Sequence, residues 1–119
     1  MNEGPLRIVR SSVARADLAK LAERQFGDMV KAVVDVTRGL MAIGGELHAD
    51  EEAALIDDGS RQEDLWGINL YPGEQGAGWI EFDSMINVRP AQGNRSRDVR
   101  DEALRTAIRE VVGRLVTDA

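Results

Sequence analysis

The only histidine of the chain, His48, lies in a glycine-led segment that also carries three consecutive acidic residues. Asp50, Glu51 and Glu52 follow it closely. An imidazole beside carboxylates can transfer protons or hold a divalent cation. The spacing matches no established metal signature, so metal and cofactor stay unknown at this stage. In the structural alternative, Asp50 caps a helix, and Glu51 and Glu52 in its first turn interact favourably with the positive end of the helix dipole.

A second polar pattern follows residues 79–88, where side chains alternate as expected for a strand. Even-numbered residues from Ile80 to Val88 would face the core. If this strand pairs with residues 65–71, one polar face collects several functional side chains. They are Asn69, Tyr71, Glu81, Asp83, Asn87 and Arg89. The alternative is an ordinary solvent-facing side of a sheet, although Trp, Asn, Tyr and Arg are unusual choices for mere solubility.

The segment from Pro90 to Arg97 precedes the last helix and is rich in groups that bind anions. Gln92, Asn94, Arg95 and Arg97 supply amide and guanidinium groups close to a helix N-terminus. The lysine and glycine spacing of a Walker A loop is missing. A structural loop, in which the amides satisfy backbone groups, is the alternative.

Hydrophobic periodicity predicts the elements that position these residues. The order is β-α-β-β-α-β-β-α, and the fold class is α+β: one mostly antiparallel sheet of about five strands, two long helices on one face and one short helix. We expect residues 1–119 to form a single domain. The expected helices are about 12–26, 50–57 and 101–116, and the expected strands are 6–10, 29–36, 40–43, 65–71 and 79–88. Gly27 and Gly59 are placed to end helices.

Charge and composition exclude several classes of function. The chain has no cysteine, which removes disulfides, thiolate metal sites and cysteine nucleophiles. Of the net charge of −6, residues 45–88 contribute 1 basic and 11 acidic side chains. This acidity argues against nucleic acid as a partner, although a solvated acidic surface is the simpler interpretation. No targeting segment or membrane span is recognisable, so we expect no membrane association and a cytoplasmic location.

The three segments 44–52, 65–72 and 80–97 also carry a resemblance to a known family. The chain resembles a small bacterial family catalogued only as a domain of unknown function. The likeness covers nearly the whole chain and implies one compact bacterial domain. It implies no activity.

Two hypotheses follow. In the first, the protein binds a small anionic ligand, and a hydrolase-type reaction uses His48 with Glu51 and Asp83 as catalytic residues. The ligand-binding residues would be Trp66, Asn69, Tyr71, Asn87, Arg89, Gln92, Asn94, Arg95 and Arg97. In the second, it is a non-catalytic interaction or regulatory module, a homodimer or one subunit of a bacterial regulatory pair, with Trp66 or Trp79 at the interface. Convergence of His48, Asp83 and Arg95, with His48 bonded to a carboxylate, would favour the first.

Overall fold

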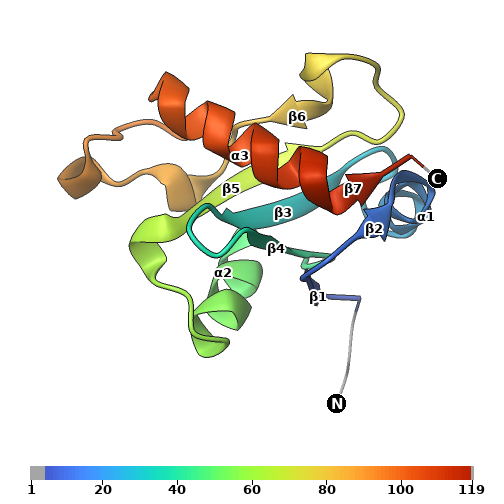
Figure 1. Ribbon diagram of the computed structural model, residues 1–119, viewed down its shortest axis with the longest axis horizontal. Coiled ribbons are helices and arrows are strands. Elements are labelled where there is room, and N and C mark those ends of the chain that lie inside the picture. The colour runs from blue at the N-terminus through green and yellow to red at the C-terminus, as the bar shows by residue number, and fades with distance from the viewer. Residues whose placement is uncertain (1–4, 119) are drawn as a thin grey trace.

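The computed structural model describes residues 5–118, which form a five-stranded antiparallel sheet with helices on both sides (Figure 1). The strand order is β1-β4-β3-β5-β6, and the bounds are Arg7–Val9 for β1, Val30–Asp35 for β3, Leu40–Ile43 for β4, Leu65–Leu70 for β5 and Ile80–Glu81 for β6. The helices are α1 (Arg15–Gln25), α2 (His48–Asp57) and α3 (Glu102–Leu115). A separate parallel pair joins β2 (Val13–Ala14) to β7 (Val116–Thr117). Four short 3-10 helices complete the path: η1 (Gln62–Asp64), η2 (Ala77–Trp79), η3 (Met85–Asn87) and η4 (Pro90–Gln92).

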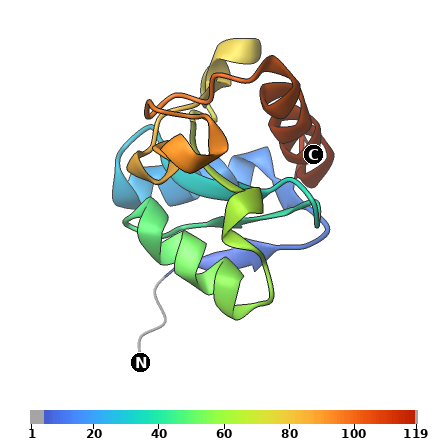
Figure 2. The same cartoon turned by 90° about the vertical axis from the view of Figure 1, so that its left-hand side faces the viewer.

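The two faces of the sheet bury different sets of side chains, because neighbouring residues of a strand point to opposite sides. Helices α1 and α3 cover the larger core, to which Ala32, Val34, Trp66 and Ile68 contribute. Helix α2 covers a smaller cluster on the other face, around Val33 and Leu65. Figure 2 shows α2 and α3 on opposite sides of the strands. The predicted placement of two long helices on one face is confirmed, and the short helix shields the face that the polar residues share.

The first hairpin is confirmed. Strands β3 and β4 pair antiparallel, and the chain turns through Gly39 at φ 71°, a conformation that favours glycine. The buried carboxylate of Asp35 fixes this turn by accepting hydrogen bonds from the N–H groups of Thr37 and Arg38 at 2.9 and 2.8 Å. Its other oxygen accepts from the Ser60 hydroxyl at 2.7 Å. Asp35 therefore acts as a structural residue that ties the turn to the end of α2.

The second predicted hairpin is correct only at its start. Strand β6 ends at Glu81 instead of continuing to Val88, and the chain then forms η3 and η4. The alternation fails because the Asn87 amide occupies the edge of β5: it accepts from the Gly67 N–H at 2.8 Å and donates to the Gly67 carbonyl at 2.9 Å. These are the two groups that a longer strand would have paired. Ser84 instead packs over Gly67, and Val88 is exposed.

Helix starts also differ from expectation. Helix α1 begins three residues later than predicted and has no side-chain cap, because Val13 and Ala14 pair with β7 instead. Helix α2 begins at His48, so Asp50 lies in its first turn and is not its cap. Helix α3 begins at Glu102, and Asp101, predicted as its first residue, is its cap: the Asp101 carboxylate accepts from the N–H groups of Ala103 and Leu104 at 2.8 and 3.2 Å.

Candidate functional site

His48 is the first residue of α2, and its ring turns inward onto β5. Its Nε2 lies 2.8 Å from the carbonyl oxygen of Ile68, and the residue is only 8% exposed. Because a carbonyl can only accept, we assign the ring proton to Nε2 and leave Nδ1 as the basic nitrogen. Burial lowers the pKa of His48 below its ordinary value, outweighing the opposite effect of the Ile68 carbonyl. The site therefore holds a neutral imidazole at physiological pH.

A cavity of about 210 Å³ opens beside this imidazole, on the sheet face that α2 covers. Its cationic groups come from two separate parts of the chain: Lys31 lies on β3, and Arg97 lies on the segment before α3. The other lining residues are Leu47, His48, Ala49, Ser84, Met85 and Ile86. The cavity thus combines two cations, a neutral imidazole, a hydroxyl and several aliphatic side chains.

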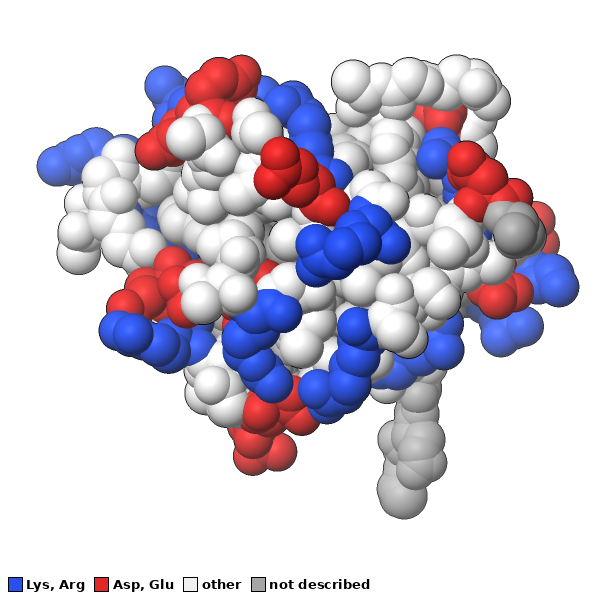
Figure 3. All heavy atoms as spheres, viewed as in Figure 1, with Lys and Arg blue, Asp and Glu red and all other residues white. Residues whose placement is uncertain are grey.

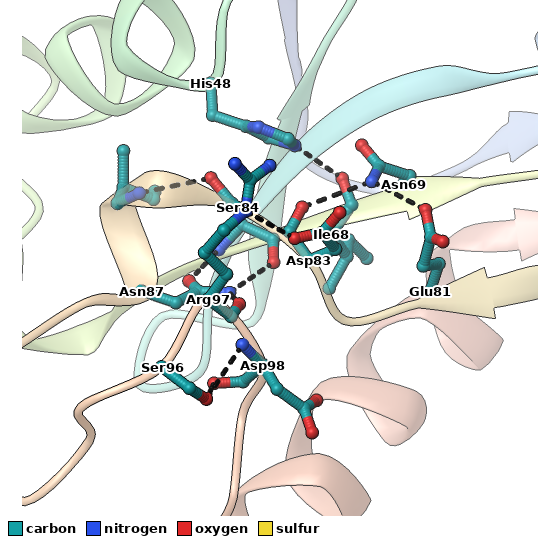
Figure 4. A network of polar contacts seen from close by, with 12 residues as sticks. His48, Ile68, Asn69, Glu81, Asp83, Ser84, Asn87, Ser96, Arg97 and Asp98 are labelled. Carbon is teal, nitrogen blue, oxygen red and sulfur yellow. Dashed lines mark hydrogen bonds and ion pairs between the residues drawn. The ribbon is translucent and has the colours of Figure 1, made fainter.

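Asp83 and Arg97 form an ion pair next to the cavity, with Arg97 Nε 2.7 Å from Asp83 Oδ1. Figure 4 shows the Arg97 side chain reaching from its loop toward the His48 ring. Both members of the pair are about half exposed, so the pair adds little to stability. Asp83 positions Arg97, and no hydrogen bond joins it to His48 among residues 5–118.

Asn69, Glu81 and Tyr71 share one surface, as the sequence predicted. The Asn69 amide donates to Glu81 Oε1 at 2.9 Å and to the Asp83 carbonyl at 3.1 Å, and the Tyr71 hydroxyl donates to the same Glu81 oxygen at 3.1 Å. Burial is the larger cause that raises the pKa of Tyr71, and this hydrogen bond raises it further. Figure 4 shows the chain of contacts running from Asn69 toward the His48 side of the sheet. This network fixes the strand end from which Asp83 follows.

Asn87 and Asn94 bond to backbone groups inside the protein. Asn87 is fully buried and also donates to the Arg97 carbonyl at 2.9 Å. The Asn94 amide donates to the Asn87 and Asp98 carbonyls, each at 2.7 Å. Both residues thereby hold the segment that carries Arg97. Their predicted ligand-binding role stays untested, but their hydrogen bonds give them a positioning role.

Arg89, Trp66 and Gln92 lie away from the His48 cavity. The Arg89 guanidinium stacks over the Trp66 ring at 4.6 Å from its centroid and donates to the carbonyls of Ile86 and Gln62, each at 2.9 Å. Burial lowers the pKa of Arg89. Trp66, Gln92 and Asn94 line a second cavity of about 280 Å³, next to the start of α3. Of the predicted ligand-binding residues, only Arg97 lines the His48 cavity, and neither cavity is lined by Asn69, Tyr71, Asn87, Arg89 or Arg95.

The acidic residues after His48 point in different directions. Glu51 is fully buried, and its Oε2 accepts from the Gly45 N–H at 2.9 Å. Burial raises the pKa of Glu51 well above its ordinary value, which favours a protonated carboxyl. Glu52 instead lies 3.4 Å from an Arg89 nitrogen. Within residues 5–118 no group of three or more metal-ligating side chains gathers, so the predicted sharing of a metal by these carboxylates is not found.

The convergence of His48, Asp83 and Arg95 that would have favoured the first hypothesis is not found. Arg95 is exposed and does not line the His48 cavity, where Arg97 lies instead, and His48 bonds to the Ile68 carbonyl rather than to a carboxylate. Among the polar lining residues, sequence reasoning missed Lys31 and Ser84. Lys31 carried a usable signal, because it is the one basic side chain within the valine-rich run of β3. Ser84 carried none, since its position depends on the early end of β6.

Arginines from the flanks balance part of the acidity of the middle segment. Asp58 contacts Arg10 and Arg38 at 2.6 and 2.8 Å, and Asp83 contacts Arg97. Hydrogen bonds from both arginines lower the pKa of Asp58 to about 2. On the face shown in Figure 3, acidic and basic side chains are interspersed and form no continuous patch of one sign. Within the described part of the chain, no helix has the length and apolar character needed to cross a membrane.

Together the sheet, its helices and the His48 cavity define an α+β domain with a candidate ligand pocket. A family model matches residues 7–115, and its family is described as a protein of unknown function, DUF5674. The chain belongs to this family, which confirms the resemblance to a family of unknown function. The bacterial origin of the family stays a prediction. No curated protein and no solved structure matches the chain.

Proposed function

We propose that the protein binds a small anionic ligand in the His48 cavity. The main observation behind the proposal is that Lys31 and Arg97, which are far apart in the sequence, line the same cavity. Lys31 forms no ion pair with another residue in the range 5–118, while Asp83 balances only part of the local positive charge. The neutral imidazole adds no charge of its own, and its Nδ1 can accept a hydrogen bond from water or from a protonated group of the ligand.

The start of α2 supports the same proposal. His48 and Ala49, the first two residues of this ten-residue helix, line the cavity, and the N-cap Leu47 makes no side-chain hydrogen bond to the helix. The first N–H groups of a helix have no partner within the helix, and they carry the positive end of its dipole. A bound anion would satisfy them and be stabilised by Lys31 and Arg97.

The size of the cavity limits the ligand. At about 210 Å³ it is smaller than the roughly 300–1,000 Å³ typical of sites for drug-sized molecules. A carboxylate or phosphate group with a short substituent is the class that fits both the volume and the charge.

A hydrolase-type reaction is the finer part of the proposal. His48 Nδ1 would take a proton from a water molecule beside the bound anion, and Arg97 would stabilise the negative charge that develops. Asp83 would position Arg97 through their ion pair. The buried, protonated Glu51 contacts Gly45 and does not line the cavity, so we give it a role in shaping the start of α2. We also propose a cytoplasmic location and a bacterial source.

The predicted interface residues Trp66 and Trp79 give the interaction-module alternative little support. Trp66 is only 4% exposed. Trp79 is partly buried, with the Arg15 guanidinium 4.1 Å from the centroid of its ring. A homodimer or regulatory pair would therefore have to use another surface, because interface anchors must reach the partner.

Titration calorimetry with inorganic phosphate and with acetate tests the proposed site. We expect Lys31→Met and Arg97→Gln each to weaken binding about tenfold to a hundredfold, the loss of one charge-assisted hydrogen bond. Arg95→Gln is the matched control, since it removes an exposed arginine two residues from Arg97 that does not line the cavity. Equal effects of Arg95→Gln and Arg97→Gln would contradict the site, as would the absence of binding by either anion.

The hydrolytic part has its own test. Turnover of simple carboxylic and phosphate esters by the wild type should fall in His48→Gln, while acetate binding persists. Binding without turnover would leave a binding domain and remove the proposed reaction.

A further inference from the structure

The mouth of the His48 cavity is unusually apolar for an anion site. Leu47 is 59% exposed and Met85 is 65% exposed, the highest values among the large hydrophobic side chains of residues 5–118. Both line this cavity, one from the N-cap of α2 and the other from η3, and the partly buried Ile86 lies beside them. Single exposed hydrophobic residues are common on protein surfaces, but two at one charged cavity form a combined surface.

A third exposed hydrophobic residue borders the same place. Phe26 is 41% exposed, and the Lys31 ammonium lies 5.2 Å from the centroid of its ring. The ring can hold the ammonium through its electron-rich face without neutralising it. Lys31 therefore has the Phe26 ring on one side and lines the cavity on the other.

From this juxtaposition we infer that the ligand is an anion carrying an aliphatic substituent. The inference rests on the proposed function, because it assigns the anionic head to Lys31, Arg97 and the start of α2. The aliphatic part lies across Leu47, Met85 and Ile86 and covers their exposed surface. Methionine suits this role because its flexible thioether adapts to chains of different length.

Charge complementarity and cavity size favour this occupant over a purely polar one. Lys31 and Arg97 line the same cavity as the exposed Leu47 and Met85, so a ligand that carries both an anionic head and an aliphatic part can contact both sets. The cavity of about 210 Å³ takes the head group and the first carbons, and the remaining carbons pack on the rim. A sulfate or phosphate ion would satisfy the cations but leave the apolar rim in water.

Two homologous series of ligands test the inference by titration calorimetry. The first runs from acetate through butyrate and hexanoate to octanoate, and the second from methyl phosphate to hexyl phosphate. A fully buried methylene strengthens binding about fourfold and a half-buried one about twofold. We expect a gain in this range per added methylene until the chain passes the rim. The series that binds more tightly identifies the head group, and chain-length dependence in either one supports the inference.

Variants at the rim separate the apolar contribution from the charged one. Leu47→Ala and Met85→Ser change exposed side chains, and neither adds a group that caps α2; both should fold, and circular dichroism checks this. They should reduce the gain per methylene by at least half while acetate affinity stays within about twofold. Ile56→Ser is the matched control: Ile56 is 44% exposed but lies near the other end of α2 and does not line the cavity.

Three results would overturn the inference, and each differs from a failure of the proposed function. If acetate and phosphate bind but chain length has no effect, the aliphatic rim is not used and only the inference fails. If light scattering finds a dimer that Leu47→Ala converts to a monomer, a second copy covers the rim instead. If no anion binds, the proposed function and the inference fail together.

Discussion

Replacing Asn87 by alanine should destabilise the protein more than any surface change near the site. The Asn87 amide is completely buried and pairs with three backbone groups, the N–H and carbonyl of Gly67 and the carbonyl of Arg97. Alanine leaves all three without a protein partner. Each unpaired buried group costs about 1–3 kcal/mol, and water entering the space left by the amide recovers part of this. We expect a loss of about 3–5 kcal/mol in the free energy of unfolding, a large share of the roughly 5–15 kcal/mol of a typical domain.

The variant Asn87→Asp tests the same hydrogen bonds through the pH dependence of its stability. The carboxylate still accepts from the Gly67 N–H, but its second oxygen faces two carbonyl oxygens, so burial and repulsion raise the folded-state pKa of the new group. A raised pKa means that the native state binds the proton more strongly than the unfolded chain. The variant should therefore be closest to wild type below pH about 4 and lose stability above it, at up to about 1.4 kcal/mol per pH unit.

Urea unfolding followed by tryptophan fluorescence and circular dichroism provides the measurement. Gln92→Ala is the control, because the exposed Gln92 amide donates to the Glu63 carbonyl at 3.1 Å, where water can replace it. The control should change the free energy of unfolding by less than about 0.5 kcal/mol. A loss below about 1 kcal/mol for Asn87→Ala, or one equal to that of the control, would refute the role of this amide in ending β6.

Two further predictions concern stability around the cavity. Glu51→Gln should stabilise the protein relative to wild type as pH rises above about 4.5, because the raised folded-state pKa of Glu51 makes wild-type stability fall there. Urea unfolding at several pH values measures this difference, which should vanish at lower pH. A difference that stays constant with pH would count against a protonated Glu51. Gly67→Ala should cost about 1–3 kcal/mol, since its methyl carbon would lie 2.6 Å from both Cβ and Oγ of Ser84. Gly73→Ala, which meets nothing within 4 Å, is the control, and thermal unfolding that moves both variants equally would contradict the close packing of Ser84 on β5.

The sequence determined the regular elements that depend on local patterns. The apolar stripe of α3 and the turn at Gly39 follow from short-range periodicity and turn chemistry, and both are present. The sheet of five strands with two long helices on one face also followed, because the strands alternate and the helices are amphipathic. Charge and the absence of cysteine also restricted the possible classes of function, and these restrictions require no knowledge of tertiary contacts.

Tertiary structure decided which residues share the site. Alternation could not reveal that β6 ends at Glu81, because the cause is the side chain of Asn87 bonding to Gly67, 20 residues earlier in the chain. That early end turns the following segment over the sheet and brings Arg97, rather than Arg95, to the cavity of Lys31 and His48. Hydrogen bonds between distant backbone and side-chain groups leave no periodic trace in a sequence. The residue types therefore indicated which chemistry a site could have, whereas the tertiary structure decided which residues line the cavity.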